Sequence, residues 1–264
     1  MITTQLFSLL SQLKLTGMSA ALQGQLEQPG TYEGCAFEQR LQFLIEQEIS
    51  ERNHRKQQRL IKSARFKLAA NAQAIDYRHP RGIKRSQMAS LLQCEWINKA
   101  QNLLLTGPCG TGKTWIACAI GQMACMKGYS TRYYRLSRLL LEFTQAKADG
   151  SYTKFLGSLN KFRYLIIDDW GLEPLKAPQR NDLLEMMDDR HGSSSTTMIS
   201  QLPFDQWYHA IGDNTLADAI LDRLMHQSHR ITLNGESMRK SKAQIEPIEV
   251  VDEKSRGDLH VDKV

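Results

Sequence analysis

The sequence lacks the features that would place it in a membrane or send it out of the cell. It contains no run of about 18 apolar residues, the length that a membrane-spanning helix needs. Its first residues, MITTQLFSLLSQLKLTGM, have neither the basic start nor the small-residue cleavage pattern of a secretory signal. We therefore expect a cytoplasmic protein with no membrane partner.

Cysteine is also sparse. The five cysteines, at positions 35, 94, 109, 118 and 125, are odd in number and include no Cys-x-x-Cys pair. This pattern suggests neither a disulfide framework nor a zinc knuckle. We expect all five to be free thiols.

The chain has 264 residues, of which 41% are hydrophobic and 23% charged, as in ordinary folded proteins. This length allows one α/β nucleotide-binding domain and an accessory piece of under about 100 residues. The net charge of +6 is unevenly placed: residues 1–100 carry 14 Lys/Arg against 8 Asp/Glu, whereas residues 101–264 carry 20 against 20. A local excess of this kind favours a polyanionic partner such as DNA.

The N-terminal part has helical periodicity. Residues 3–27 predict a short amphipathic helix or a helical pair, and residues 35–70 predict one long helix without Pro or Gly. The second half of the long helix carries a basic stripe of side chains three or four positions apart: Arg52, Arg55, Lys56, Arg59 and Lys62. Either DNA or an acidic partner contacts this stripe, or the stripe is a solvated face that pairs in part with Glu46, Glu48 and Glu51.

After a turn-rich connector at residues 76–82 and a further helix at 85–99, short apolar runs alternate with helical segments. We expect strands at 102–106, 131–136, 163–168, 196–200 and 230–233, and helices at 113–127, 137–147, 152–161, 178–190, 204–210 and 215–228. This alternation predicts an α/β fold with a parallel sheet and helices on both faces. The expected parts are an all-helical segment at 1–75, a nucleotide-binding domain at 76–242 and an acidic, mobile tail at 243–264.

The strongest functional signal lies between the first expected strand and the helix that follows it. The segment GPCGTGKT has the P-loop spacing Gly-x-x-x-x-Gly-Lys-Thr in the strand–loop–helix context that its mechanism requires. In such a loop, backbone N–H groups surround the phosphates of ATP, the lysine reaches the β- and γ-phosphates, and the threonine hydroxyl binds Mg²⁺. The residues expected to bind ATP are Gly107, Pro108, Cys109, Gly110, Thr111, Gly112, Lys113, Thr114 and Trp115.

A second signal is the apolar run Tyr164-Leu-Ile-Ile, which ends in two acids. A strand beside the P-loop strand can deliver a carboxylate to the magnesium ion, and we assign Asp168 to this role, through water. We assign Asp169 to positioning or deprotonating the attacking water. Many related ATPases have the longer Glu there, so hydrolysis is expected to be slow. The alternative for Asp169 is a helix cap.

Ser200 follows a third strand, whose polar end is expected to emerge between the two motifs. In one interpretation Ser200 senses the γ-phosphate or orients water. In the other it only starts the turn before Pro203. The sequence does not decide between these interpretations.

Taken together, these motifs resemble one known family. The segments NLLLTGPCGTGKT (102–114), LIIDDWG (165–171), SQLP (200–203), AILDRL (219–224) and GESMR (235–239) are similar to those of the IstB transposition-helper ATPases of bacterial insertion sequences. These proteins are of the AAA+ class and are relatives of the DnaC helicase loader. The resemblance covers about residues 35–242.

The resemblance implies roles that the residues alone do not. It places Arg223 where AAA+ subunits extend an arginine finger into a neighbour's ATP site, which implies self-assembly; the alternative is a salt bridge with Asp218 or Asp222. It makes Arg239 a second phosphate sensor, although the chain ends too soon for a full helical lid, so that the lid is reduced or absent. The implied activity is hydrolysis of ATP to ADP and phosphate, slow and stimulated by DNA.

The family likeness also implies the biological role. The expected protein binds ATP with Mg²⁺, assembles on duplex DNA as a ring or helical filament, and recruits or stimulates its transposase. Two alternatives are a helicase loader of the DnaC type, which would prefer single-stranded DNA and a helicase, and a small-molecule kinase, which would need an arginine-rich lid. The N-terminal helices hold either DNA or the transposase.

Overall fold

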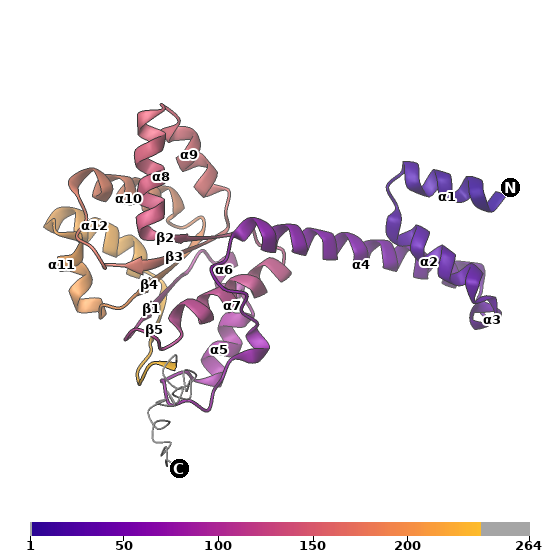
Figure 1. The fold of residues 1–264 in the computed structure, drawn as a ribbon, viewed down its shortest axis with the longest axis horizontal. Helices are drawn as coiled ribbons and strands as arrows, with labels where there is room; N and C mark the ends of the chain where they lie inside the picture. The colour runs from indigo at the N-terminus through magenta and orange to yellow at the C-terminus, as the bar shows by residue number, and fades with distance from the viewer. Residues whose placement is uncertain (1, 239–264) are drawn as a thin grey trace, which may run out of the picture.

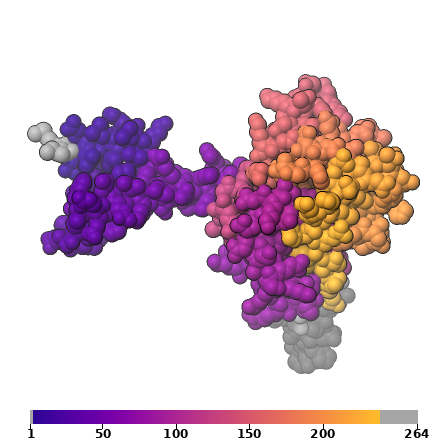
Figure 2. All heavy atoms as spheres, turned by 180° about the vertical axis from the view of Figure 1, so that it is seen from behind, coloured from indigo at the N-terminus to yellow at the C-terminus, as the bar shows by residue number. Residues whose placement is uncertain are grey.

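The structure, a computed structural model, describes residues 2–238. It consists of an α/β core and a helical arm that projects from one side of the core (Figure 1). The space-filling view shows the arm joined to the core by a narrow neck (Figure 2). The α/β core and the helical N-terminal region agree with the sequence-based expectation.

A five-stranded, all-parallel sheet forms the centre of the core, in the order β2-β3-β4-β1-β5. Strand β1, which precedes the P-loop, is buried along its whole length, as is β4 beside it. The long parallel crossovers that such a sheet requires are all helical. The strands are β1 (Asn102–Thr106), β2 (Thr131–Arg135), β3 (Tyr164–Trp170), β4 (Ser195–Ser200) and β5 (Ser228–Thr232).

Helices cover both faces of the sheet, and each face has its own hydrophobic cluster. On one face lie η1 (Ala72–Ala74), α5 (Arg85–Leu92), α6 (Glu95–Asn98) and α7 (Lys113–Met126). On the other lie α8 (Leu136–Ala148), α9 (Tyr152–Asn160), α10 (Ala177–Arg190), η2 (Phe204–Gln206), α11 (Trp207–Ile211) and α12 (Asn214–Met225). This arrangement leaves the carboxyl edge of the sheet open for a site.

The arm is built on one long helix, α4 (Phe37–Ala64), with α1 (Ile2–Gln12), α2 (Thr16–Glu27) and α3 (Pro29–Tyr32) at its far end. Helix α2 packs on α4 so closely that a Cβ atom on Gly17 would lie 2.8 Å from the Gln47 carbonyl oxygen. The buried Glu48 carboxylate accepts hydrogen bonds from the backbone N–H groups of Gly17 and Met18. Gly17 therefore permits close helix packing.

The long helix ends earlier than its periodicity predicts. Arg65 has a left-handed backbone (φ 53°), and the chain then runs along the core. Phe66 contacts Gly121 on α7, and Ala70 and Ile75 are buried in the core. We therefore propose the boundary between arm and core near residue 65, where sequence reasoning placed it at 75.

Smaller differences have local causes. The helix expected at 85–99 is divided into α5 and α6, because Cys94 between them adopts a left-handed backbone (φ 59°). Among residues 2–238, no helix is long and apolar enough to cross a membrane. The expectations for the acidic tail and for a reduced lid concern residues from 239 onward, outside the described residues.

Candidate functional site

The loop between β1 and α7 has the backbone of a phosphate cradle. Gly107, Gly110 and Gly112 have φ values of 138°, 83° and 91°, which L side chains rarely adopt. The loop is also tightly surrounded: a Cβ atom on Gly110 would lie 2.0 Å from the Ser237 Oγ atom. Glycine at these positions therefore allows backbone N–H groups to approach a phosphate closely, as the sequence predicts.

Lys113, at the start of α7, lies within this loop. Its ammonium group donates hydrogen bonds to the carbonyl oxygens of Gly107 and Pro108, at 2.7 and 2.8 Å. Thr111 is fully buried and also donates to the Pro108 carbonyl, at 2.9 Å. The lysine charge is thus held at the cradle, where the phosphates of a nucleotide would lie.

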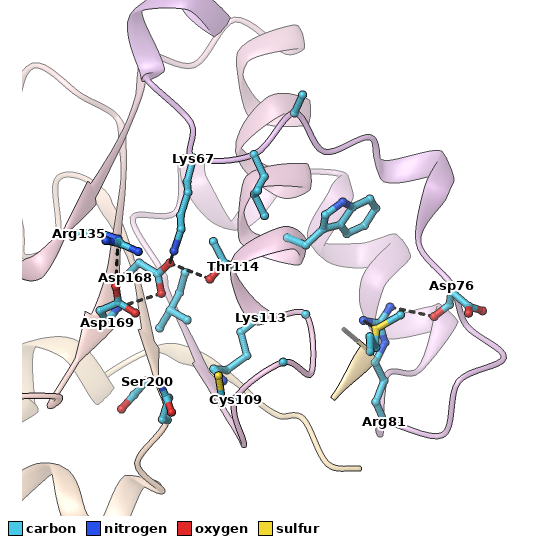
Figure 3. Close-up of a pocket in the computed structure, with 18 of the residues that line it drawn as sticks. Lys67, Asp76, Arg81, Cys109, Lys113, Thr114, Arg135, Asp168, Asp169 and Ser200 are labelled. Carbon is cyan, nitrogen blue, oxygen red and sulfur yellow. Dashed lines mark hydrogen bonds and ion pairs between the residues drawn. The ribbon is translucent and has the colours of Figure 1, made fainter. Parts of the chain in front are cut away.

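Thr114 and Asp168 converge on the point where a metal ion is expected (Figure 3). The Thr114 hydroxyl donates to the Asp168 Oδ2 atom at 2.8 Å, and the Tyr133 hydroxyl donates to the same atom at 2.7 Å. Asp168 is only 2% exposed, and the Lys67 ammonium lies 3.9 Å from its Oδ2 atom. Burial and the nearby Asp168 carboxylate raise the pKa of Tyr133, so its hydroxyl stays a donor. These oxygen ligands match the preference of Mg²⁺.

A β-bulge brings the second acid to the same pocket. Consecutive strand residues normally face opposite sides of a sheet. Here the pairing of β3 with β4 is irregular between Ile167 and Trp170, and Asp169 has a left-handed backbone (φ 66°). As a result Asp168 and Asp169 both line one cavity of about 920 Å³, together with the P-loop. Asp169 belongs to β3 and α10 begins at Ala177, so the helix-cap interpretation is wrong.

Asp169 has a cationic partner at the end of the neighbouring strand. The Arg135 Nε atom lies 3.2 Å from the Asp169 Oδ2 atom, and Arg135 is 54% exposed (Figure 3). Arg135 is aligned with Asp168 in the β2–β3 register. Sequence reasoning missed Arg135, Tyr133 and Lys67, although the end of the second expected strand meets the same sheet edge as the acids.

Ser200 and Gln201 also line the cavity. The Ser200 hydroxyl donates to the Trp170 carbonyl at 2.8 Å and accepts from the Leu202 N–H at 3.0 Å. These bonds stabilise the turn after β4, as expected if Ser200 starts the turn before Pro203. Gln201 is exposed and lines the same cavity, so its amide can face a ligand.

A second arginine, also not foreseen from the sequence, supports the loop from the other side. Arg81 is 2% exposed and donates to the carbonyl oxygens of Thr111, at 3.1 Å, and Asp76, at 2.9 Å. A Cβ atom on Gly112 would lie 2.5 Å from its Nη1 atom. Burial lowers the pKa of Arg81. Arg81 thus fixes the P-loop against the connector that precedes α5. No local motif marks Arg81 in the sequence.

Other predicted site residues lie elsewhere. Arg223, on α12, does not line the cavity of its own chain; it forms an ion pair with Asp188 on α10 rather than with the expected Asp218 or Asp222. In the basic stripe, Arg52 and Arg55 pair with Glu48 and Glu51. Arg239 lies outside the described residues.

The comparison with protein families decides which family this chain belongs to. The family model described as "IstB-like ATP binding protein" matches residues 8–245. The chain belongs to this family. The IstB-like protein is 42% identical over 233 residues to an insertion sequence ATP-binding protein of Sinorhizobium fredii, covering 88% of this chain and 95% of that one. It is 44% identical over 204 residues to an insertion sequence ATP-binding protein of Pseudomonas fluorescens, covering 77% and 88%.

Solved structures with the same fold include a helicase loader and a replication initiator. DnaI matches with a TM-score of 0.53 at 18% identity, over 68% of this chain and 92% of that one. The DnaC helicase loader matches with a TM-score of 0.50 at 18% identity, over 62% and 96%. A replication initiator, DnaA bound to AMPPCP and single-stranded DNA, matches with a TM-score of 0.52 at 13% identity, over 65% and 52%. At these identities the likeness shows the fold alone, the AAA+ P-loop fold expected from the sequence.

Proposed function

We propose that this IstB-like protein binds ATP with Mg²⁺, assembles on duplex DNA, and recruits or stimulates the transposase of its insertion sequence. One observation carries the proposal: the P-loop, the Thr114–Asp168 pair and Asp169 line a single cavity. The insertion sequence context comes from the names of the relatives.

The residues of the cavity suggest how ATP is bound and hydrolysed. The loop N–H groups and Lys113 would hold the phosphates, and Thr114 with Asp168, through water, would hold the magnesium ion, which neutralises phosphate charge when bound. Asp169 would orient the water that attacks the γ-phosphorus. Its side chain is one methylene shorter than the Glu expected of related ATPases, so we propose that turnover is slow.

The position of Arg223 supports the proposed assembly. Because this side chain does not line its own cavity, a catalytic role for it would require the ATP site of a neighbouring subunit. It is 29% exposed, and its partner Asp188 is 48% exposed, so the intramolecular ion pair is weak and exchangeable. Head-to-tail contacts of this kind produce a ring or an open filament.

DNA binding is supported by the charge of the arm. Within α4, the cations nearest the core, Arg59 and Lys62, are exposed and form no ion pair among the described residues. The stripe therefore combines both earlier interpretations: its outer half pairs with glutamates, and its inner half is available to phosphate. The helicase-loader alternative shares only the fold, whereas the relatives at 42–44% identity are insertion sequence proteins.

A nucleotide-dependent assembly assay tests this proposal. Light scattering and electron microscopy would follow the protein with duplex or single-stranded DNA, with and without Mg-ATP. We expect assemblies only with duplex and Mg-ATP, none with Lys113→Ala, and normal assembly with Lys127→Ala, a matched loss of an exposed lysine at the end of the same helix. Assembly with a preference for single strands would favour the loader.

A further inference from the structure

One lysine from outside the sequence motifs reaches the acid end of the ATP cavity. Lys67 lies three residues beyond the end of α4 and lines the cavity together with the P-loop. Its ammonium group points toward Asp168, with 3.9 Å between the Nζ atom and the Oδ2 atom (Figure 3). In the same view, Arg81 and Asp76 lie on the far side of Lys113. Lys67 therefore belongs to the end of the cavity where the metal ion and the terminal phosphate are expected.

The backbone around Lys67 is fixed to the helix that follows the P-loop. On one side of Lys67, Phe66 packs on Gly121 of α7, so closely that a Cβ atom on this glycine would lie 2.5 Å from the Phe66 ring. On the other side, Ala70 is 1% exposed and packs in the same hydrophobic cluster as α7. The Lys67 side chain is 31% exposed, and its stem is flexible. The backbone thus holds this lysine at the site, while its ammonium group can change partner.

Lys67 supplies positive charge to a buried carboxylate. Asp168 is 2% exposed, and neutral groups donate its hydrogen bonds: the hydroxyls of Thr114 and Tyr133 and the backbone N–H of Asp169. The pair with Lys67 is the one ion pair that Asp168 forms among the described residues. A buried carboxylate without a cation is costly. Lys67 therefore offsets the charge of Asp168 in this structure.

Asp168 cannot keep Lys67 as its main partner when it also holds Mg²⁺. A bound divalent ion is the largest local charge in its site and offsets the carboxylate. Lys67 then faces a second cation, and the anion that the same end of the cavity offers is the γ-phosphate of ATP. An ammonium group, with its three donors, suits a phosphate. Because ADP lacks the γ-phosphate, a lysine at this position can distinguish the two nucleotides.

We propose that Lys67 exchanges Asp168 for the γ-phosphate when Mg-ATP binds, and that this contact makes the site prefer ATP to ADP. With Mg-ADP, Lys67 loses Asp168 and gains no phosphate. Lys67 therefore strengthens the binding of ATP and weakens the binding of ADP. A lysine that only neutralised Asp168 would affect both nucleotides alike. This inference rests on the proposed function, because it assumes that the cavity binds Mg-ATP.

The first test compares the affinities of the two nucleotides by calorimetry in Mg²⁺. Lys67→Met keeps the length of the side chain and removes its charge. Mg-ADP binding should tighten about two- to fivefold, because no partly exposed ion pair has to be broken. The preference for a non-hydrolysable ATP analogue over ADP should fall at least about tenfold, because the ion pair cancels in this ratio and the contact with a charged phosphate remains.

Two further variants control this comparison. Lys127→Met removes an exposed lysine just after α7 and should change neither affinity. Lys67→Arg keeps the positive charge and should retain most of the preference for the ATP analogue. Circular dichroism would verify that each variant is folded before titration.

The second test asks whether Asp168 is the partner that Lys67 gives up. In an Asp168→Asn background, ADP can still bind through the P-loop, but Lys67 has no carboxylate to leave. Lys67→Met should then no longer tighten the binding of ADP in Mg²⁺. The titrations use ADP alone, so the result does not depend on hydrolysis.

The outcomes separate this inference from the proposed function. A parent chain that binds neither nucleotide defeats both. A parent that binds both, while Lys67→Met leaves the ratio of the two affinities unchanged, overturns the phosphate contact and leaves the proposed function standing. ADP binding that does not tighten in Lys67→Met, or that tightens equally with and without the Asp168 carboxylate, overturns the exchange.

Discussion

Asp168→Asn separates the structural role of this carboxylate from its proposed metal role. The Oδ2 atom accepts from two hydroxyls, those of Thr114 and Tyr133, and the Oδ1 atom accepts from the backbone N–H of Asp169 at 2.9 Å. An amide offers one acceptor atom where the carboxylate offers two. If its oxygen stays with the hydroxyls, its NH₂ group faces the Asp169 N–H, and a partly buried donor loses its partner.

The size of the effect follows from this mismatch. A buried unsatisfied donor costs about 1–3 kcal/mol. For a chain of this size that corresponds to a fall in melting temperature of roughly 2–12 °C, which thermal unfolding without nucleotide would measure. The proposed metal role adds a separate effect: calorimetry should show that Mg²⁺ increases ATP affinity in the parent but not in Asp168→Asn. An unchanged Mg²⁺ effect in the folded variant would refute the assignment of Asp168 to the metal.

Three further predictions concern the loop and the subunit contact. Arg223→Ala and Asp169→Asn should each hydrolyse ATP poorly. Their mixture should regain turnover, because a mixed interface combines an intact Asp169 from one subunit with an intact Arg223 from the other. If titrating one variant into the other never raises the rate, Arg223 does not act between subunits. Gly110→Ala should weaken ATP binding at least tenfold, because its left-handed φ and the 2.0 Å contact with the Ser237 Oγ atom both oppose a Cβ atom; equal affinity in calorimetry would contradict the cradle. Mg-ATP should slow alkylation of the exposed Cys109 at pH 8, measured by mass spectrometry. The buried thiols of Cys94 and Cys125 should react slowly with or without Mg-ATP. Burial raises the pKa of both to about 11 and keeps them protonated well above pH 8.

The sequence predicts the core well because its strands are short and alternate with helical segments, and because β1 and β3 contain continuous apolar runs. The placing of the P-loop and Asp168 at one edge of the sheet was predictable because both lie at the carboxyl ends of buried parallel strands. The same rule could have drawn attention to Arg135, which ends β2 and is aligned with Asp168. It was missed because one arginine in a basic chain carries no local signal.

Other features depend on tertiary contacts that periodicity does not contain. The end of α4 is set by the packing of Phe66 on Gly121, so the helical pattern beyond Ala64 is misleading. The bulge at Asp169 is a property of the β3–β4 pairing. The division of the basic stripe depends on Glu48, which the packing of α2 buries beside Arg52 and Arg55. Burial therefore decides which charges remain available.

Isothermal titration of the purified chain with ATP, in Mg²⁺ and in EDTA, tests the central claim most directly. The arrangement of the loop, Thr114 and Asp168 predicts one ATP per chain, with Mg²⁺ strengthening the binding and Lys113→Ala abolishing it. If ATP produces no heat of binding at any magnesium concentration, with duplex DNA present and the protein folded, the claim is contradicted.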